Sequence, residues 1–97
     1  MRKSSVITNV LNFVDDDYFN NYYVGIATDV KQRLIAHQVN IGDKSAYRYY
    51  VADSEDEARE IEKYLLDRYD FQGGTGGGDA PRWVYVYRIT KQTREDR

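Results

Sequence analysis

The 97-residue sequence predicts a single α+β domain, with a small central β-sheet and flanking helices. Three observations support this fold class. Residues 5–14 and 83–89 are rich in the β-branched and aromatic types that favour strands. Residues 28–39 and 54–69 place apolar side chains at helical spacing. No change in composition and no linker divides the chain, whose length suits one domain.

The first half of the chain is predicted to form a β-hairpin followed by a helix. Residues 5–14 would be the first strand and residues 22–26 the second, joined by a turn rich in Asp and Asn. Thr28 or Asp29 can cap the helix, because their side-chain oxygens accept free backbone N–H groups. Gly42 then marks the end of that helical segment.

The second half is predicted to add a strand, a helix and a final strand. Residues 46–52, AYRYYVA, form the third strand candidate. Ser54 and Glu57 make a capping box that opens the next helix. Residues 83–89, WVYVYRI, alternate as the last strand, and the charged tail 90–97 is expected to be frayed. The predicted order is therefore β-β-α-β-α-β.

Composition narrows the function classes. The chain holds 14 Lys and Arg against 16 Asp and Glu, which argues against avid nonspecific binding to nucleic acid. It has no cysteine, and its one histidine is His37, so thiolate zinc sites and two-histidine metal sites are excluded. No apolar run approaches membrane-spanning length and no signal core is evident, so we expect a cytoplasmic protein without membrane contact.

Glu62 lies inside the apolar stripe of the second predicted helix. That stripe contains Ala58, Ile61, Leu65 and Tyr69. Helical phase therefore keeps Glu62 from open solvent. A carboxylate in such a place needs a partner, a metal ion or a water-filled cleft, because burying it alone is costly.

The first predicted helix has a matching pair of polar residues. Arg33 and His37 lie four residues apart, on one face, beside the apolar Val30 and Leu34. One interpretation is structural: Arg33 and Glu62 would form a salt bridge at the edge of the core. The other is that these side chains belong to a functional site.

The spacing of these residues resembles the GIY-YIG nuclease superfamily. The resemblance covers roughly residues 5–69 and rests on a strand ending in Tyr-Val-Gly, an arginine ten positions after the tyrosine, a histidine four further on, and a glutamate on the next helix. Here these residues are Tyr23, Val24, Gly25, Arg33, His37 and Glu62. The resemblance implies that these side chains converge on one concave surface of a small sheet.

The resemblance also implies a chemistry. Members of the family cleave phosphodiesters with one divalent ion, so Glu62 would bind Mg²⁺ or Mn²⁺, hard cations that prefer oxygen ligands. Arg33 would stabilise charge on the phosphate through its planar fork of donors. Tyr23 and His37 would belong to the hydroxyl and water network that activates the nucleophile.

Two positions depart from the family pattern. Phe13 stands where the first motif should supply a tyrosine, and Gly74 stands where many members carry asparagine. Gly74 belongs to the glycine-rich stretch 72–79, which has neither the Lys-Ser/Thr of a Walker A loop nor the strand-to-helix setting of a dinucleotide fingerprint. That stretch is either a connector or a place where another backbone approaches closely.

The favoured function is a small, metal-dependent phosphodiesterase or endonuclease that acts on DNA. The alternative is a catalytically degenerate module that binds nucleic acid or a protein partner, and a third interpretation is purely structural. Because the charge balance is near neutral, DNA affinity should be weak and salt-sensitive. A protein partner or a second copy of the chain would then supply the missing affinity.

Overall fold

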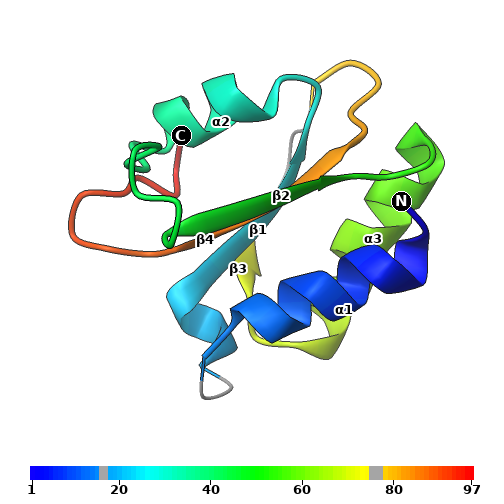
Figure 1. Ribbon diagram of the computed structural model, residues 1–97, viewed down its shortest axis with the longest axis horizontal. Helices are drawn as coiled ribbons and strands as arrows, with labels where there is room; N and C mark the ends of the chain where they lie inside the picture. The colour runs from blue at the N-terminus through cyan, green and yellow to red at the C-terminus, as the bar shows by residue number, and fades with distance from the viewer. Residues whose placement is uncertain (16–17, 75–77) are drawn as a thin grey trace.

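The computed structural model describes residues 1–15, 18–74 and 78–97, and it has the α+β class that the sequence predicts (Figure 1). A four-stranded mixed sheet is flanked by three helices in this part of the chain. In chain order the elements are α1 Lys3–Phe13, the 3₁₀ turn η1 Phe19–Asn21, β1 Tyr22–Ala27, α2 Val30–Ala36, β2 Tyr47–Val51, α3 Glu55–Arg68, β3 Gln72–Gly73 and β4 Trp83–Arg88.

The sheet has the strand order β2-β4-β1-β3. The last long strand, β4, runs antiparallel to both β1 and β2, and the two-residue β3 runs parallel to β1. Tyr23 of β1 lies opposite Tyr87, and Gly25 lies opposite Tyr85. Because side chains alternate between the faces of a strand, Tyr23, Tyr85 and Tyr87 share one face of the sheet.

The predicted strand at 5–14 is wrong, since residues 5–13 belong to helix α1 and Val14 is its C-cap. Val6 and Val10 lie one helical turn apart and are both fully buried, where α1 packs against α3 and β2. Strand propensity is a weak preference that such packing overrides. The hairpin with residues 22–26 is consequently absent, and the described elements run α-β-α-β-α-β-β rather than β-β-α-β-α-β.

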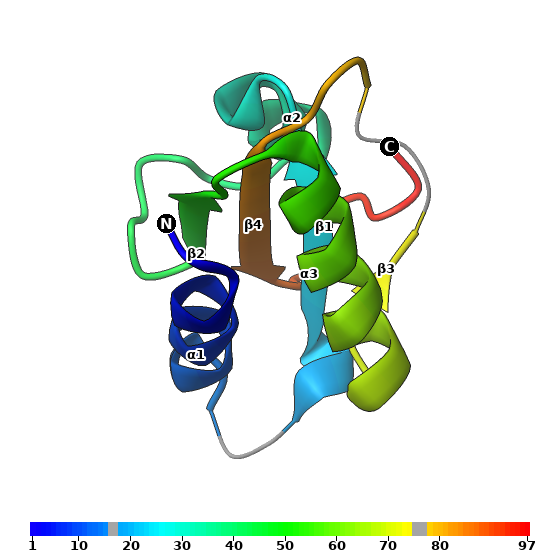
Figure 2. The same ribbon diagram turned by 90° about the vertical axis from the view of Figure 1, so that its right-hand side faces the viewer.

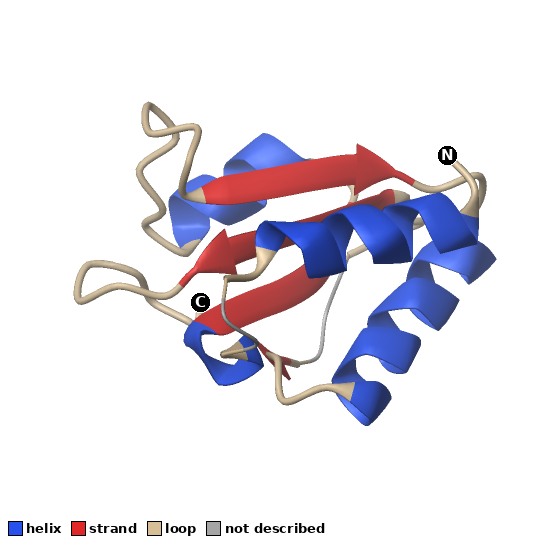
Figure 3. Ribbon diagram, turned by 60° about the horizontal axis from the view of Figure 1, so that its bottom comes forward, coloured by secondary structure: helices blue, strands red, loops and turns tan. Residues whose placement is uncertain are grey.

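Helices cover the two faces of the sheet unequally. Both α1 and α3 lie over one face, and α2 lies over the other (Figures 2 and 3). The first layer is the larger core, which includes Val24 and Val86 from the sheet. The second core gathers the sheet-face tyrosines under Leu34 of α2 and Val39 just beyond it. This second, aromatic layer contains the candidate site.

Both predicted helix caps are present. The Asp29 carboxylate accepts from the Gln32 N–H at 3.1 Å, and the Ser54 hydroxyl accepts from the Glu57 N–H at 3.1 Å. The first of these helices ends at Ala36, earlier than predicted. Gln38 adopts a left-handed φ of 59°, and the Val39 N–H bonds back to the Leu34 carbonyl, which terminates the helix before Gly42 is reached.

The strands predicted at 46–52 and 83–89 are confirmed as β2 and β4. Residues 16–17 of the predicted turn and residues 75–77 of the glycine-rich stretch lie outside the described residues. Within the described part of that stretch, Gly73 supports the close-approach interpretation. A Cβ there would lie 2.6 Å from the Val24 carbonyl oxygen, so only glycine lets β3 pair with β1 at this point.

Candidate functional site

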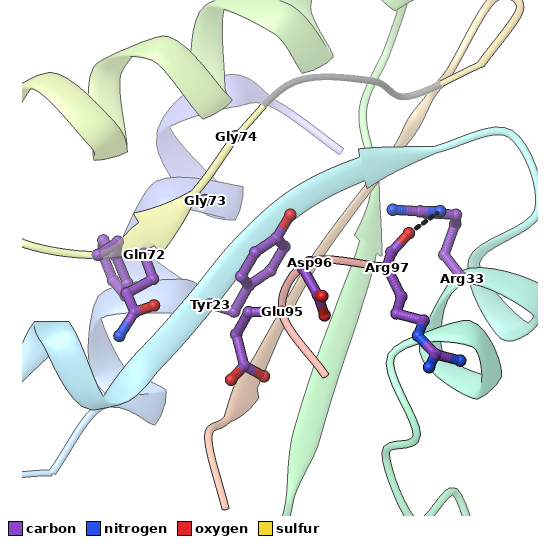
Figure 4. Close-up of a pocket in the computed structure, with 9 residues that line it drawn as sticks. Tyr23, Arg33, Gln72, Gly73, Gly74, Glu95, Asp96 and Arg97 are labelled. Atoms are coloured by element: carbon purple, nitrogen blue, oxygen red, sulfur yellow. Dashed lines mark hydrogen bonds between the residues drawn. The ribbon is translucent and has the colours of Figure 1, made fainter. Parts of the chain in front are cut away.

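A polar pocket of about 590 Å³ opens beside β1 on the aromatic side of the sheet (Figure 4). Its walls come from three places: β1 and α2, the segment at β3, and the C-terminal tail. The lining residues are Tyr23, Arg33, Phe71, Gln72, Gly73, Gly74, Glu95, Asp96 and Arg97. Two of the four predicted site residues, Tyr23 and Arg33, thus line one cavity.

His37 joins these two from beneath the pocket. It is fully buried, its ring centroid lies 4.6 Å from that of Tyr23, and its Nε2 lies 3.3 Å from Nη2 of Arg33. Arg33 and His37 stand on successive turns, as their spacing predicts, although His37 is already the C-cap of α2. The structure therefore brings Tyr23, Arg33 and His37 together.

The partners of His37 define which ring nitrogen carries hydrogen. Nδ1 lies 2.7 Å from the Arg94 carbonyl oxygen, and a carbonyl can only accept, so Nδ1 donates. Nε2 is then the acceptor, and it receives the Tyr85 hydroxyl at 3.0 Å as well as the Arg33 guanidinium. Burial, and then the charge of Arg33, lowers the pKa of His37, while the hydrogen bond to the Arg94 carbonyl opposes this shift. The two donors that meet Nε2 require a lone pair on that nitrogen.

The alternative salt bridge between Arg33 and Glu62 is absent from the ion pairs of the described residues. Nη1 of Arg33 instead donates to the main-chain oxygen of Arg97, the last residue of the sequence, at 3.0 Å. Its Nε is buried and has no acceptor in the described structure. The guanidinium therefore keeps an unused donor, which suits a further oxygen ligand.

Glu62 approaches this group from the opposite layer. It lies on α3, is half-buried, and has neither a hydrogen bond nor an ion pair with any described residue, whereas its neighbours Glu60 and Lys63 are paired. Burial raises its pKa to about 7, an effect that Arg59 partly offsets. The predicted convergence on one concave surface is thus incomplete, because Glu62 does not line the pocket.

The charge of Glu62 nevertheless acts on the tyrosines of the site. Burial is the main cause that raises the pKa of Tyr23, and the charge of Glu62 raises it further while Arg33 opposes it. The same two charges act on Tyr85, whose pKa rises to about 12 mainly through burial. Tyr23 and Tyr85 therefore stand between a cation on α2 and a carboxylate on α3.

Tyr85 and Tyr87 are site residues that the sequence reasoning missed. Both belong to β4, flank Tyr23 with nearly parallel rings, and are almost completely buried. Phe13, which was expected to replace a site tyrosine, lies on α1 with its ring against Tyr22 in the other layer. The alternation of tyrosine in WVYVYRI was a usable signal, because it places both rings on one face.

The C-terminal tail also belongs to the site, contrary to the prediction that it is frayed. The Arg94 N–H bonds to the His37 carbonyl at 2.7 Å, and Thr93 is buried. The Tyr87 hydroxyl donates to Glu95 at 2.9 Å. These contacts join two segments that are far apart in sequence, and hydrophobicity along the tail gives no sign of them.

The donor set fits a hard divalent cation only in part. No group of three or more His, Cys, Asp or Glu that could hold a metal ion occurs among the described residues. Mg²⁺ often uses one or two carboxylates and otherwise keeps water or substrate oxygens. Glu62, a half-buried carboxylate without another partner in the described chain, can be such a ligand.

No protein-family model, curated protein or solved structure matches this chain. No helix of the described residues is long and apolar enough to cross a membrane.

Proposed function

We propose that this chain is a small metal-dependent phosphodiesterase that cleaves nucleic acid at the Arg33 pocket, as its resemblance to the GIY-YIG superfamily implies. One observation carries the proposal: Arg33 and Glu62 are not paired with each other in the described structure. A buried guanidinium nitrogen without an acceptor and a half-buried carboxylate without a donor favour a site built for ligands.

Each residue has a chemical task under this proposal. The Arg33 guanidinium binds a phosphate oxygen and stabilises the negative charge that develops during displacement. His37 is a positioning residue: its Nδ1–H is fixed on the Arg94 carbonyl, and its Nε2 holds the Arg33 guanidinium and the Tyr85 hydroxyl in place. Tyr23, in the wall of the pocket, uses its hydroxyl to orient the attacking water. Mg²⁺ or Mn²⁺ held by Glu62 would supply Lewis-acid stabilisation of the phosphate.

Cleavage assays test the proposal directly. The chain is incubated with single-stranded, duplex and branched DNA in the presence of Mg²⁺ or Mn²⁺. We expect metal-dependent cleavage that falls at least about 100-fold in Glu62→Gln and in Arg33→Ala, in line with the loss of one charge-stabilising group. Glu60→Gln is the matched control, because it removes an exposed carboxylate from the same helix.

The second candidate function is a binding module without catalysis, and the tail favours it. The pocket already holds a main-chain oxygen and acidic side chains of the tail, so it can accommodate an extended protein segment. Binding of DNA or peptide without cleavage under any metal condition, and with equal affinity in Glu62→Gln, would favour this candidate over the phosphodiesterase.

Affinity for DNA should be weak and strongly salt-dependent. The chain has a formal net charge of −2, and two carboxylates line the pocket beside Arg33. Few phosphates can therefore be neutralised, and each contact is lost as salt rises. We expect dissociation constants above about 1 µM at physiological salt, measured by fluorescence anisotropy. Submicromolar affinity that persists at high salt would contradict this.

A further inference from the structure

The tail changes character at Arg94. Up to that residue it is part of the fold, because Arg94 exchanges two hydrogen bonds of 2.7 Å with His37, one through its N–H and one through its carbonyl. Thr93, just before it, is buried and closes a turn with Thr90. The chain is therefore fixed at the floor of the pocket.

Beyond Arg94, residues 95–97 line the pocket itself (Figure 4). Glu95 accepts from the Tyr87 hydroxyl, and the main-chain oxygen of Arg97 accepts from Nη1 of Arg33. Asp96 and Arg97 are exposed, and none of the ion pairs of the described chain involves Glu95 or Asp96. Residues 95–97 are thus held by one side-chain contact at each end, whereas Arg94 alone is held by two bonds to the buried His37.

Residues 95–97 bring to the pocket an oxygen that competes with phosphate for Arg33 and two carboxylates that repel phosphate. The main-chain oxygen of Arg97 occupies one N–H donor of Arg33, the arginine that α2 contributes to the pocket. The carboxylates of Glu95 and Asp96 add negative charge where an anionic ligand has to approach. The Arg97 main-chain oxygen takes one of the two N–H groups of Nη1, so a phosphate that uses both of them has to displace it.

We propose that residues 95–97 are an internal competitor that closes the Arg33 pocket, so that a phosphate group enters only when this segment leaves. The inference rests on the proposed function for the identity of the ligand. Arg94 acts as the hinge point, because its two bonds to His37 persist when the three following residues move. Binding is then reduced by the fraction of molecules in which the segment is in place.

A phosphate titration followed by ¹⁵N NMR tests this. In the full chain, inorganic phosphate should shift the Arg33 side-chain resonance and, at the same concentrations, convert the amides of Glu95, Asp96 and Arg97 to the mobile, exchange-prone state. The Arg94 amide should stay protected. Glu95→Gln/Asp96→Asn should bind phosphate about tenfold more tightly, because the segment no longer opposes the anion. The side-chain amide introduced at position 95 can still accept from the Tyr87 hydroxyl, so the fold is retained.

Glu60→Gln/Asp67→Asn is the matched control. It makes the same change in net charge on exposed positions of α3, away from the pocket, and disrupts only exposed ion pairs. Equal tightening in both double variants would overturn the proposal, as would phosphate binding at Arg33 with unchanged tail amides or no phosphate binding in either protein.

Cleavage is read separately on a ten-residue oligothymidylate. Faster cleavage by Glu95→Gln/Asp96→Asn than by wild type supports the proposal that residues 95–97 compete with phosphate. Phosphate-driven release of the tail in a protein that never cleaves also supports it, and in that case only the proposed phosphodiesterase activity fails.

Discussion

Replacing Glu62 with glutamine is expected to stabilise the protein at pH 8 by about 1–2 kcal/mol, after allowance for solvent screening of a partly exposed group. Burial raises the pKa of Glu62 to about 7, so at pH 8 the folded chain holds a charged carboxylate that lacks a partner in the described structure. Glutamine keeps the shape and removes the charge. Natural proteins commonly give up stability in this way at sites that bind ligands.

The sign of the effect follows from proton linkage. The folded pKa of Glu62, about 7, exceeds its ordinary value of 4.5, so between these values the folded state binds more protons than the unfolded state. The stabilisation that comes from the protonated Glu62 carboxyl in the folded state is complete below pH 4.5 and is lost as the pH rises to about 7. Wild type and Glu62→Gln should therefore differ little near pH 4.5 and diverge above it.

The contribution of His37 to the free energy of unfolding changes with pH in the opposite direction. Its folded pKa lies below the ordinary 6.5, so the unfolded state takes up its proton first, and acidification below pH 6.5 costs stability. In wild type the pH-dependent contributions of Glu62 and His37 to stability oppose each other. Glu62→Gln removes one of them, so this variant should lose stability on acidification more steeply than wild type.

Urea unfolding between pH 4.5 and 8 measures both effects. Glu60→Gln is the control; its exposed ion pair with Lys3 should contribute less than about 1 kcal/mol. A Glu62→Gln variant that loses about 3 kcal/mol at pH 8 would instead indicate that the carboxylate holds a buried partner, as in the structural interpretation of Arg33 and Glu62.

Local signals were sufficient for much of the second half of the chain. The serine at 54 and the glutamate three residues later define the start of α3, because capping is a contact within one helical turn. The helical stripe likewise placed Glu62 where it is half-buried. Such features depend on spacing alone and can be predicted without knowing the tertiary structure.

The N-terminal helix could not be assigned in this way. Its β-branched residues favour a strand, yet Val6 and Val10 are also spaced by one helical turn, and only packing against α3 decides between the two. The error had a further consequence. With a helix at the start of the chain, the strand beside β1 has to come from elsewhere, and β4 takes that place.

The parts of the site that could not be predicted from the sequence depend on contacts between segments that are far apart in the chain. Tyr85 reaches His37 only because β4 pairs with β1 in one register, and a shift by one residue would turn its ring to the other face. The tail reaches the pocket only because α2 ends at His37, whose ring and carbonyl both face Arg94. Neither contact leaves a pattern in the local sequence.

Gly25 lies opposite Tyr85 in the β1–β4 register and leaves room for the Tyr85 ring. Gly25→Ala is expected to cost about 2–3 kcal/mol of stability. A Cβ at this position would overlap the hydroxyl and ring of Tyr85, directly across the sheet. Tyr85 is 1% exposed and cannot move aside without disturbing the aromatic layer. Overpacking a rigid interior typically costs about 1–3 kcal/mol.

The same substitution should also displace the Tyr85 hydroxyl from Nε2 of His37. A loss of stability that leaves Tyr85 in place would not break this hydrogen bond. Urea unfolding gives the stability, and the ¹⁵N resonances of the His37 ring report the lost hydrogen bond. Gly42→Ala is the control, because a Cβ there meets only the exposed Asn40 side chain, at 3.3 Å. If Gly25→Ala retains wild-type stability and an unchanged His37 ring, Tyr85 does not lie across Gly25, and the register that assembles the site is wrong.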